Sequence, residues 1–281
     1  MKTPPLLPHS PFPRVSPEEE LKNIDAFIKN KKTKTGRKKI ILGVSGGIDS
    51  ATSFNVIARN YEKSDIIAVH LPYYESSSDD FFETISPIKL PPENIILSPI
   101  KDSVDAIAKS VGIPASAGMT GNGSFARAQD DKSQNVRLGN IMARVRMIHL
   151  YDLAKKYDGL VCGTENRSEY FLGYFTRFGD AASDLEPIAH LYKTEIRALA
   201  TYLGVPKKIV TKAPTAGLWD GQTDEEEMGF SYEEADPVLY YYFEQKRPIE
   251  EIISMGYPNG KRIIDHALFQ SFKHEVPYHA R

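Results

Sequence analysis

The sequence has almost no cysteine and no long hydrophobic run. A single cysteine, Cys162, among 281 residues excludes a disulfide framework and suits a reducing compartment. No stretch of about 18 apolar residues is present, so no membrane span is expected. The N-terminal run "MKTPPLLPHSPFPRV" has too many prolines and too short an apolar stretch for a signal peptide. These absences predict a soluble, cytoplasmic protein with no membrane partner.

A strong net charge and metal-ligand spacing are also missing. The net charge is −2, so the composition lacks the positive excess typical of nucleic-acid-binding proteins. Seven histidines are scattered without the spacing of zinc or iron ligands, which disfavours such a site. The Lys-rich run of residues 29–39 is interpreted as a solvated linker, with nucleic-acid contact as the less favoured alternative.

The chain is nevertheless long and apolar enough to build a substantial core. At 41% hydrophobic residues it needs no disulfide or metal to stabilise that core. Residues 1–16 are interpreted as an extended Pro-rich tail, and residues 17–281 as one α/β domain, with or without a modest helical appendage. The run Ser16-Pro17-Glu18-Glu19-Glu20 predicts a helix start, because it combines a capping serine, a proline at the first helical position and acids in the first turn.

Four short apolar runs with β-branched residues alternate with helix-like segments. The runs are "KIILGV", "DIIAVHL", "NIILSPI" and "GLVCGT". Parallel strands are covered on both faces and therefore have such nearly continuous apolar runs. The sequence predicts an α/β fold with a mostly parallel sheet flanked by helices and a helical C-terminal part. The expected helices span residues 49–60, 79–85, 102–111, 134–157, 193–203, 231–244 and 260–274.

Three segments directly follow expected strand ends. They are "SGGIDS", the stretch after "AVHL", and "GTENRSE". Ligands bind outside the carboxyl ends of the strands in sheets of this kind, so the three segments should converge on one site. Residues 115–134 have loop composition, and a loop of that length is either disordered or an active-site element.

The loop "SGGIDS" is the most specific short motif. Backbone amides of a Gly-rich turn that opens a helix form an anion site, helped by the helix dipole. Neither the G-x-x-x-x-G-K-[ST] phosphate loop nor the Rossmann G-x-G-x-x-G pattern is present. The pattern S-G-G-x-D-S after a strand resembles the pyrophosphate loop of the ATP pyrophosphatases, which cleave ATP between the α and β phosphates and adenylate a substrate oxygen. The alternative is an ordinary tight strand-to-helix turn.

Longer motifs narrow this resemblance. The stretches "NIMARVRM", "GTENRSEYFLGYFTRFGDAASDLEPIAHLYKTEIRALATYLGVP" and "KAPTAGLWDGQTDEEEMG" closely resemble the ammonia-dependent NAD synthetases. The resemblance implies a homodimeric ligase of NAD biosynthesis and an adenine nucleotide alpha-hydrolase-like fold. In its reaction the carboxylate of deamido-NAD attacks ATP, pyrophosphate leaves, and ammonia then displaces AMP. Adenylation brings negative charges together, which calls for Mg²⁺ and cations around the phosphates.

The resemblance assigns roles to individual residues. It implies ATP contacts at Gly43, Val44, Ser45, Gly46, Gly47, Ile48, Asp49 and Ser50, and at Thr164, Lys193 and Thr215. It implies Mg²⁺ ligation by Asp49 and Glu169, with Glu165 as the competing carboxylate. Two carboxylates suffice, because Mg²⁺ keeps its other positions for phosphate and water. It implies deamido-NAD contacts at Arg144, Arg177 and Asp184.

Two faces of similar spacing run along the expected helix 134–157: a polar face of Arg137, Asn140 and Arg144, and an apolar face of Leu138, Ile141, Val145 and Ile148. A solvated polar face opposite the core explains Arg137 by itself. The motif "ARVRM" favours a substrate role for Arg144.

Two positions depart from the family pattern. Arg177 stands where many members have lysine, so a planar fork replaces a point charge. In "FKHEVP" the order of the family's His-Lys pair is reversed, and either Lys273 or His274 inherits its dinucleotide contact.

The single cysteine also bears on the nitrogen source. Most glutamine-hydrolysing partners use a reactive cysteine in a domain of their own, for which this chain has neither length nor a second cysteine. Free ammonia, or ammonia from a separate protein, is expected. Two alternatives stay open: another enzyme of the same loop group, such as a nucleotide amidase or a transfer-RNA modifier, and a nucleotide-binding regulator without catalysis. The net charge argues against RNA, and the joint presence of Asp49, Glu169 and Lys193 argues against a regulator.

Overall fold

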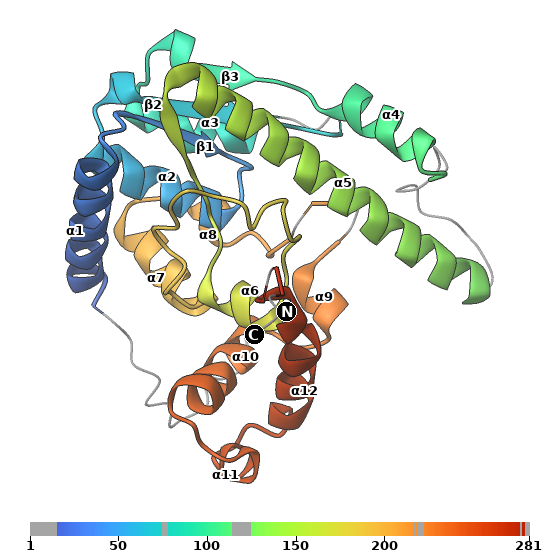
Figure 1. Ribbon diagram of the computed structural model, residues 1–281. Helices are drawn as coiled ribbons and strands as arrows, with labels where there is room; N and C mark the ends of the chain where they lie inside the picture. Colours follow the sequence, from blue (N-terminus) through green and yellow to red (C-terminus); the bar gives the residue numbers. More distant parts are fainter. Residues whose placement is uncertain are drawn as a thin grey trace.

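Four parallel strands form one sheet in the order β3-β2-β1-β4 (Figure 1). The strands are β1 (Lys39–Gly43), β2 (Ile66–His70), β3 (Ile95–Leu97) and β4 (Gly159–Cys162). The computed structural model describes residues 16–74, 78–113, 125–215, 217–218, 222–275 and 277–278, with the backbone alone described for 125–132. The predicted α/β fold with a parallel sheet flanked by helices is confirmed.

Both faces of the sheet are apolar, which is why its strands have nearly continuous hydrophobic runs. Ile40 and Leu42 of β1 belong to one core cluster, whereas Ile41 between them belongs to another. This follows from the period of two along a strand, which sends successive side chains to opposite faces. Each face must therefore be covered by helices.

The helices that cover the sheet lie on both sides of it (Figure 1). One core cluster joins the sheet to α1 (Pro17–Thr35), α2 (Ile48–Asn60) and α7 (Lys193–Tyr202). The other joins it to α4 (Lys101–Ser110) and α5 (Phe125–Tyr157). The shorter helices near the sheet are α3 (Asp79–Ile85), α6 (Arg167–Leu172) and α8 (Lys207–Val210), with single 3-10 turns at Lys63–Asp65, Ser86–Ile88 and Pro92–Asn94.

The C-terminal part is helical, as predicted, and has a core of its own. It contains α9 (Asp224–Met228), α10 (Tyr232–Leu239), α11 (Ile249–Ser254), α12 (Gly260–Gln270) and a 3-10 turn at Ser271–Lys273. The aromatic run after α10 forms a π-helical turn at Tyr240–Glu244, and Tyr241 is 2% exposed. The run therefore packs between helices, as expected, and the expected helix 231–244 is divided at Leu239.

The interpretation of residues 29–39 as a linker is wrong. Helix α1 continues to Thr35 and ends at Gly36, whose φ of 68° is the left-handed conformation that favours glycine. Ile28 is 1% exposed, while the lysines that follow it face solvent or lie partly buried, so the run is the polar side and end of an amphipathic helix. Ser16 precedes the helix as predicted, but its side chain makes no capping hydrogen bond. Of the predicted Pro-rich tail, residues 1–16, only Ser16 lies among the described residues.

Helix α5 is longer than the sequence predicts. It begins at Phe125, so the loop assignment of residues 125–134 is wrong, and residues 114–124 lie outside the described part. Leu138 and Val145 are buried as expected, but Ile148 is 56% exposed. None of the helices in the described segments has the length and apolar character that a membrane crossing requires.

Candidate functional site

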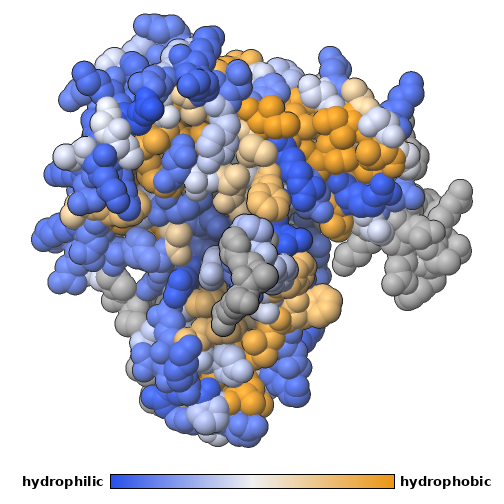
Figure 2. All heavy atoms as spheres, viewed as in Figure 1, coloured by the Kyte–Doolittle hydropathy of each residue, from blue (hydrophilic) through white to orange (hydrophobic). Residues whose placement is uncertain are grey.

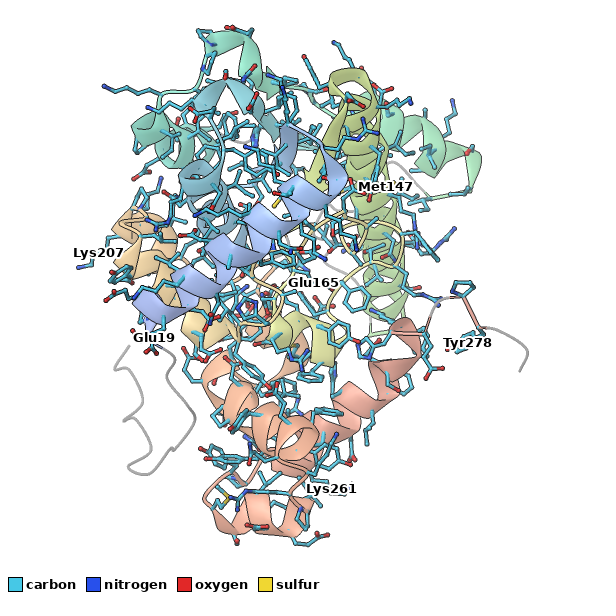
Figure 3. All side chains as sticks on the ribbon, turned by 60° about the vertical axis from the view of Figure 1, so that its left-hand side comes forward. Glu19, Met147, Glu165, Lys207, Lys261 and Tyr278 are labelled. Carbon is cyan, nitrogen blue, oxygen red and sulfur yellow. The ribbon has the colours of Figure 1, made fainter. Side chains whose placement is uncertain are left out.

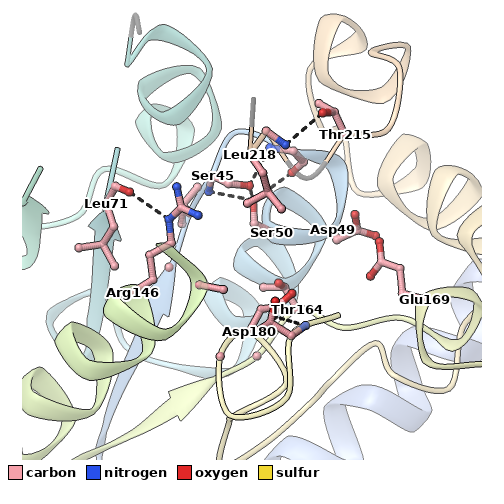
Figure 4. A pocket seen from close by; sticks show the side chains of 18 of the residues that line it. Ser45, Asp49, Ser50, Leu71, Arg146, Thr164, Glu169, Asp180, Thr215 and Leu218 are labelled. Atoms are coloured by element: carbon pink, nitrogen blue, oxygen red, sulfur yellow. Dashed lines mark hydrogen bonds between the residues drawn. The ribbon is translucent and has the colours of Figure 1, made fainter. Parts of the chain in front are cut away.

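A pocket opens at the carboxyl ends of β1, β2 and β4, and its cavity volume is about 450 Å³ (Figure 4). That volume lies in the range of about 300–1,000 Å³ common for small-molecule sites. The three segments that follow these strand ends line it, as predicted. Further lining residues come from α5, from the segment 212–218 and from Asp224 at the start of α9.

The loop between β1 and α2 presents backbone amides to this pocket. Gly47 is the N-cap of α2 and has no side chain to cap it, so the first amides of the helix are available to an anion. The Ser50 hydroxyl accepts a hydrogen bond from the Ser45 amide at 3.1 Å and donates to the Gly47 carbonyl at 3.0 Å. The loop is thus already folded into a tight turn.

Gly46 shapes this turn without lining the pocket. Its φ is +81°, and a Cβ placed on it would lie 2.6 Å from Cβ of Asp80 in α3. Any other residue at this position would both strain the backbone and collide with α3. The two glycines of "SGGIDS" therefore have different tasks, one in packing and one at the helix start.

Lys193 joins the two carboxylates predicted to hold a metal ion. Its Nζ lies 2.7 Å from Oδ2 of Asp49 and 2.9 Å from Oε1 of Glu169, and its side chain is 2% exposed. Figure 4 shows Asp49 and Glu169 pointing toward each other from opposite sides. Asp49 comes from the first turn of α2, Glu169 from α6 and Lys193 from the start of α7, so only tertiary folding brings them together.

A buried network holds these three groups in place. Asn166 is fully buried; its amide group donates to Oδ1 of Asp49 at 3.0 Å, and its side-chain oxygen caps α6 by accepting from the Glu169 amide at 2.9 Å. The Ser168 hydroxyl accepts from the Lys193 amide at 2.8 Å and donates to the buried Asp236 at 2.6 Å. The orientation of the charged side chains is therefore fixed by α6, α7 and α10 together.

Burial and neighbouring charges shift the pKa values of Lys193 and Glu169 in opposite directions. Burial by itself would lower the pKa of Lys193, but the Asp49 and Glu169 carboxylates outweigh it and raise that pKa, so the ammonium stays charged. Burial raises the pKa of the Glu169 carboxyl, and the Lys193 charge opposes this. The cluster carries more acid than base in an apolar setting, which is an environment that favours a cation.

The carboxylates at this position fit a Mg²⁺ site that phosphate completes. Asp49 and Glu169 are 18% and 17% exposed and both line the pocket, whereas Glu165 does not line it. Among the described residues no group of three or more His, Cys, Asp or Glu side chains has the geometry of a complete metal site. Mg²⁺ characteristically takes one or two carboxylates and shares the rest of its coordination with phosphate and water.

Glu165 does not line the pocket, and its backbone amide donates to another carboxylate, Glu186, at 3.0 Å. Figure 3 labels Glu165 near the centre of the view. Oε1 of Glu165 is buried and has no hydrogen-bond partner in the described part of the chain. Burial, assisted by the Glu186 charge, raises the pKa of Glu165 to about 8, and burial raises that of Glu186 to about 7.

This buried carboxylate makes stability depend on pH. Folding raises the Glu165 pKa from 4.5 to about 8, so the folded protein binds the additional proton and loses stability as pH rises between these values. Glu165→Gln removes the loss, and its free energy of unfolding relative to the unsubstituted protein should rise by about 1–3 kcal/mol between pH 5.5 and pH 8.5. Urea denaturation at both pH values measures this. The exposed Glu93→Gln is the control, and an equal change in both variants would contradict the assignment.

The structure brings most of the predicted ATP contacts together. Thr164, Lys193 and Thr215 line the pocket with the β1–α2 loop, from which Gly46 alone of the predicted residues is absent. The Gly217 amide donates to the Thr215 hydroxyl at 3.0 Å.

The predicted deamido-NAD contacts lie outside the pocket lining. Arg144 is exposed and donates to the Arg177 carbonyl at 3.3 Å. The Arg177 guanidinium lies over the Phe272 ring, 5.2 Å from its centroid. Asp184 accepts a hydrogen bond from the Val161 amide of β4 at 2.8 Å. Arg144 and Arg177 are thus neighbours, whereas Asp184 lies at the edge of the sheet.

Of the two C-terminal candidates, Lys273 is the one that holds the 173–175 segment. Its Nζ donates to the carbonyls of Gly173 and Phe175, the latter at 3.0 Å. His274 stacks on Tyr170 with ring centroids 4.2 Å apart. Both side chains therefore have structural partners in this state.

Sequence reasoning missed Arg146, a pocket-lining cation. Its Nε donates to the Leu71 carbonyl at 3.1 Å (Figure 4). Ala143, Met147 and Leu150 line the pocket with it, at the i, i+3, i+4 and i+7 spacing of one helix face. The sequence signal for this residue was a single arginine on an otherwise apolar face of the helix. Arg144, the predicted substrate contact, lies on a face about 200° away around the helix.

The chain is similar to known proteins over most of its length. Residues 20–277 match the family model described as NAD synthase. An NH3-dependent NAD(+) synthetase from Fusobacterium nucleatum is 37% identical over 243 residues, which cover 85% of this chain and 84% of that relative.

Solved structures show the same fold. The NMN synthetase from Francisella tularensis has a TM-score of 0.74 at 28% identity, covering 94% of this chain and 98% of that one. The NH3-dependent NAD synthetase from Campylobacter jejuni, in complex with the nitrate ion, has a TM-score of 0.72 at 26% identity, covering 95% and 100%. Since the family model spans nearly the whole sequence, and a relative well above 30% identity aligns over most of both chains, this chain belongs to the NAD synthase family.

Proposed function

We propose that the chain amidates deamido-NAD with ammonia to form NAD, using ATP and releasing AMP and pyrophosphate. The observation that carries this is the arrangement of Asp49, Lys193 and Glu169 beside the open N-terminus of α2, in a chain of the NAD synthase family. A carboxylate is a poor electrophile and must first be adenylated. The site offers what that step needs, namely anion-binding amides and oriented charges in one pocket.

Each charged group has a distinct task in this reaction. The loop amides and the α2 dipole bind the phosphates that leave as pyrophosphate. Mg²⁺ held by Asp49 and Glu169 would supply positive charge as the leaving phosphates gain negative charge. Lys193, released in part from these carboxylates, orients its ammonium toward the same phosphates.

The nitrogen source follows from Cys162. It is 2% exposed within β4, and burial raises the pKa of its thiol, so it is not a reactive thiolate for glutamine hydrolysis. It is the only cysteine of the sequence. We propose ammonia, free or from a separate protein, as the nitrogen donor, and a reducing cytoplasm as the location of the chain.

A steady-state assay tests this function. Pyrophosphate release and NAD formation are followed with ATP, Mg²⁺ and ammonium, and deamido-NAD is compared with nicotinic acid mononucleotide. The mononucleotide is the second candidate substrate, because the NMN synthetase structure resembles this chain as well as the NAD synthetase structure does. Product formation with neither substrate, or with glutamine but not ammonium, would contradict the proposal.

Arg177 is the proposed contact that distinguishes deamido-NAD from ATP. Loss of a hydrogen bond to a charged group corresponds to roughly a 10- to 150-fold weaker affinity, and we expect this for deamido-NAD in Arg177→Ala. Arg177→Lys should recover much of the loss because the charge remains. The KM for ATP should change little in both variants. Equal losses for both substrates, or none for either, would exclude this role.

Exposed apolar residues support the proposal of a homodimer. Ile107 of α4, and Val136 and Ile148 of α5, are 39%, 39% and 56% exposed. Figure 2 shows apolar side chains gathered over this part of the surface. Exposed apolar side chains that gather on one part of the surface favour an interface. Sedimentation velocity at micromolar concentration tests it, and a monomer with full activity would contradict it.

A further inference from the structure

One lysine of the pocket lining, Lys212, is not part of the cluster of Asp49, Lys193 and Glu169. Among the pocket-lining residues that the structure describes, Arg146, Lys193 and Lys212 are the Lys and Arg side chains. Lys193 is enclosed by Asp49 and Glu169, and Arg146 is bound to a backbone carbonyl. The Lys212 side chain is instead 45% exposed, and its Nζ lies 2.7 Å from Oδ2 of Asp80.

Asp80 places this lysine beside the phosphate-binding loop. It stands in the first turn of α3 and packs directly against Gly46, whose added Cβ would lie 2.6 Å from Cβ of Asp80. Hydrogen bonds from Lys208 and Lys212 lower the pKa of Asp80, so its carboxylate remains ionised. The Lys212 ammonium is therefore held one side chain away from the turn that binds phosphate.

The backbone that follows Lys212 is anchored to the start of α9. The Pro214 carbonyl accepts a hydrogen bond from the Asp224 amide at 3.0 Å. Thr215, Leu218, Ser50 and Asp180 all line the pocket, and in the view of Figure 4 Thr215 and Leu218 lie on the opposite side of Ser50 from Asp180. A change of side-chain rotamer alone can move the Lys212 ammonium between Asp80 and the pocket, because its stem has four flexible carbons.

Electrostatics favour a move of the Lys212 ammonium from Asp80 to the phosphates of ATP. An exposed Lys–Asp pair contributes little, since solvent screens it, whereas a bound triphosphate presents several negative charges to the same ammonium. Asp80 also keeps a second partner, because Nζ of Lys208 lies 2.6 Å from its Oδ1. Asp80 would therefore not be left unpaired when Lys212 departs.

We propose that Lys212 leaves Asp80 when ATP binds and becomes a phosphate-binding residue, while Lys208 stays with Asp80. The inference rests on the proposed use of ATP at this pocket. It assigns opposite effects to the two members of one ion pair. Lys212 contributes to ATP affinity, and Asp80 competes with ATP for it.

Lys208 provides a matched control. Lys208 and Lys212 lie four residues apart and both bind Asp80, but only Lys212 lines the pocket. Isothermal titration with Mg²⁺ and a non-hydrolysable ATP analogue should give a Kd roughly 10- to 150-fold higher for Lys212→Met than for the unsubstituted chain. Lys208→Met should change it by less than about twofold, and Lys212→Arg should restore most of the affinity.

The decisive variant is Asp80→Asn. Because it removes the competing charge, it should lower the Kd for the analogue by up to about fivefold. The KM for deamido-NAD should stay unchanged in all variants, which separates ATP binding from a general loss of structure. A higher Kd for Asp80→Asn, or equal effects of Lys208→Met and Lys212→Met, would show that the pair is only structural. If the unsubstituted chain does not bind the analogue, the proposed function itself is wrong; if it binds and Lys212→Met binds equally well, only the role of Lys212 is wrong.

Discussion

Asp49→Asn and Glu169→Gln are each expected to lower kcat by roughly 100- to 1,000-fold or more, on the scale of losing one well-placed electrostatic contact in a transition state. Each substitution keeps the shape of the side chain and removes one of the two carboxylates that face Lys193. The remaining carboxylate would then pair fully with Lys193 and no longer attract Mg²⁺. Pyrophosphate release from ATP in the presence of deamido-NAD and ammonium measures the loss.

Two comparisons make this result specific. Asp49 and Glu169 act as one unit, so the double substitution should cost much less than the product of the single effects. Glu165→Gln is the matched control, since Glu165 is four residues from Glu169 but does not line the pocket. Near-normal turnover for Glu169→Gln together with a large loss for Glu165→Gln would reverse the metal assignment.

Lys193→Met is expected to lower both activity and stability. Lys193 is a 2% exposed cation between two carboxylates, and removing it leaves these acids facing each other without compensation. Breaking a buried ion pair in this way costs about 3–5 kcal/mol, which corresponds to a Tm lower by roughly 10 °C. Thermal unfolding without divalent metal at pH 7.5 measures the effect.

The same variant should respond to Mg²⁺ differently from the unsubstituted chain. Mg²⁺ can replace the missing positive charge between Asp49 and Glu169, so millimolar Mg²⁺ should raise the Tm of Lys193→Met more than that of the unsubstituted chain. Lys22→Met is the control, because Lys22 is an exposed partner of Glu18 and its loss should stay within about ±0.5 kcal/mol. A Tm of Lys193→Met that equals that of Lys22→Met would exclude the buried-cation account.

The reaction class could be predicted from the sequence, because the motifs that indicate it form from residues close together in the chain. "SGGIDS" after an apolar run predicts a strand, a tight turn and an open helix N-terminus within a few residues. The long motifs around "GTENRSE" and "LYKTE" carried the family resemblance, which the family model and relatives confirm. The parallel strands could also be predicted, because strands buried on both faces are nearly continuous apolar runs in the sequence.

The ends of the helices were harder to predict from the sequence, since they depend on contacts with residues distant in the chain. A run of lysines gives the same local signal in a linker and on the solvated side of a helix, and only the packing of Ile28 against the sheet layer shows which applies. Helix α5 likewise begins at Phe125, within a stretch of loop-like composition.

The sequence by itself determined that this chain is an α/β member of the NAD synthase family and that its one cysteine lies in a strand. It also predicted Asp49 and Glu169 as the carboxylates of the site, with Glu165 as the competitor. Only the tertiary structure decided which charges meet. Lys193 and Asp49 are 144 residues apart, and Lys212 and Asp80 are 132 apart, so no local pattern relates them. It also decided that Arg146 faces the pocket while Arg144 faces Arg177. The physical reason is that a helix offers several possible faces, and the neighbours that select one are brought to it only by folding.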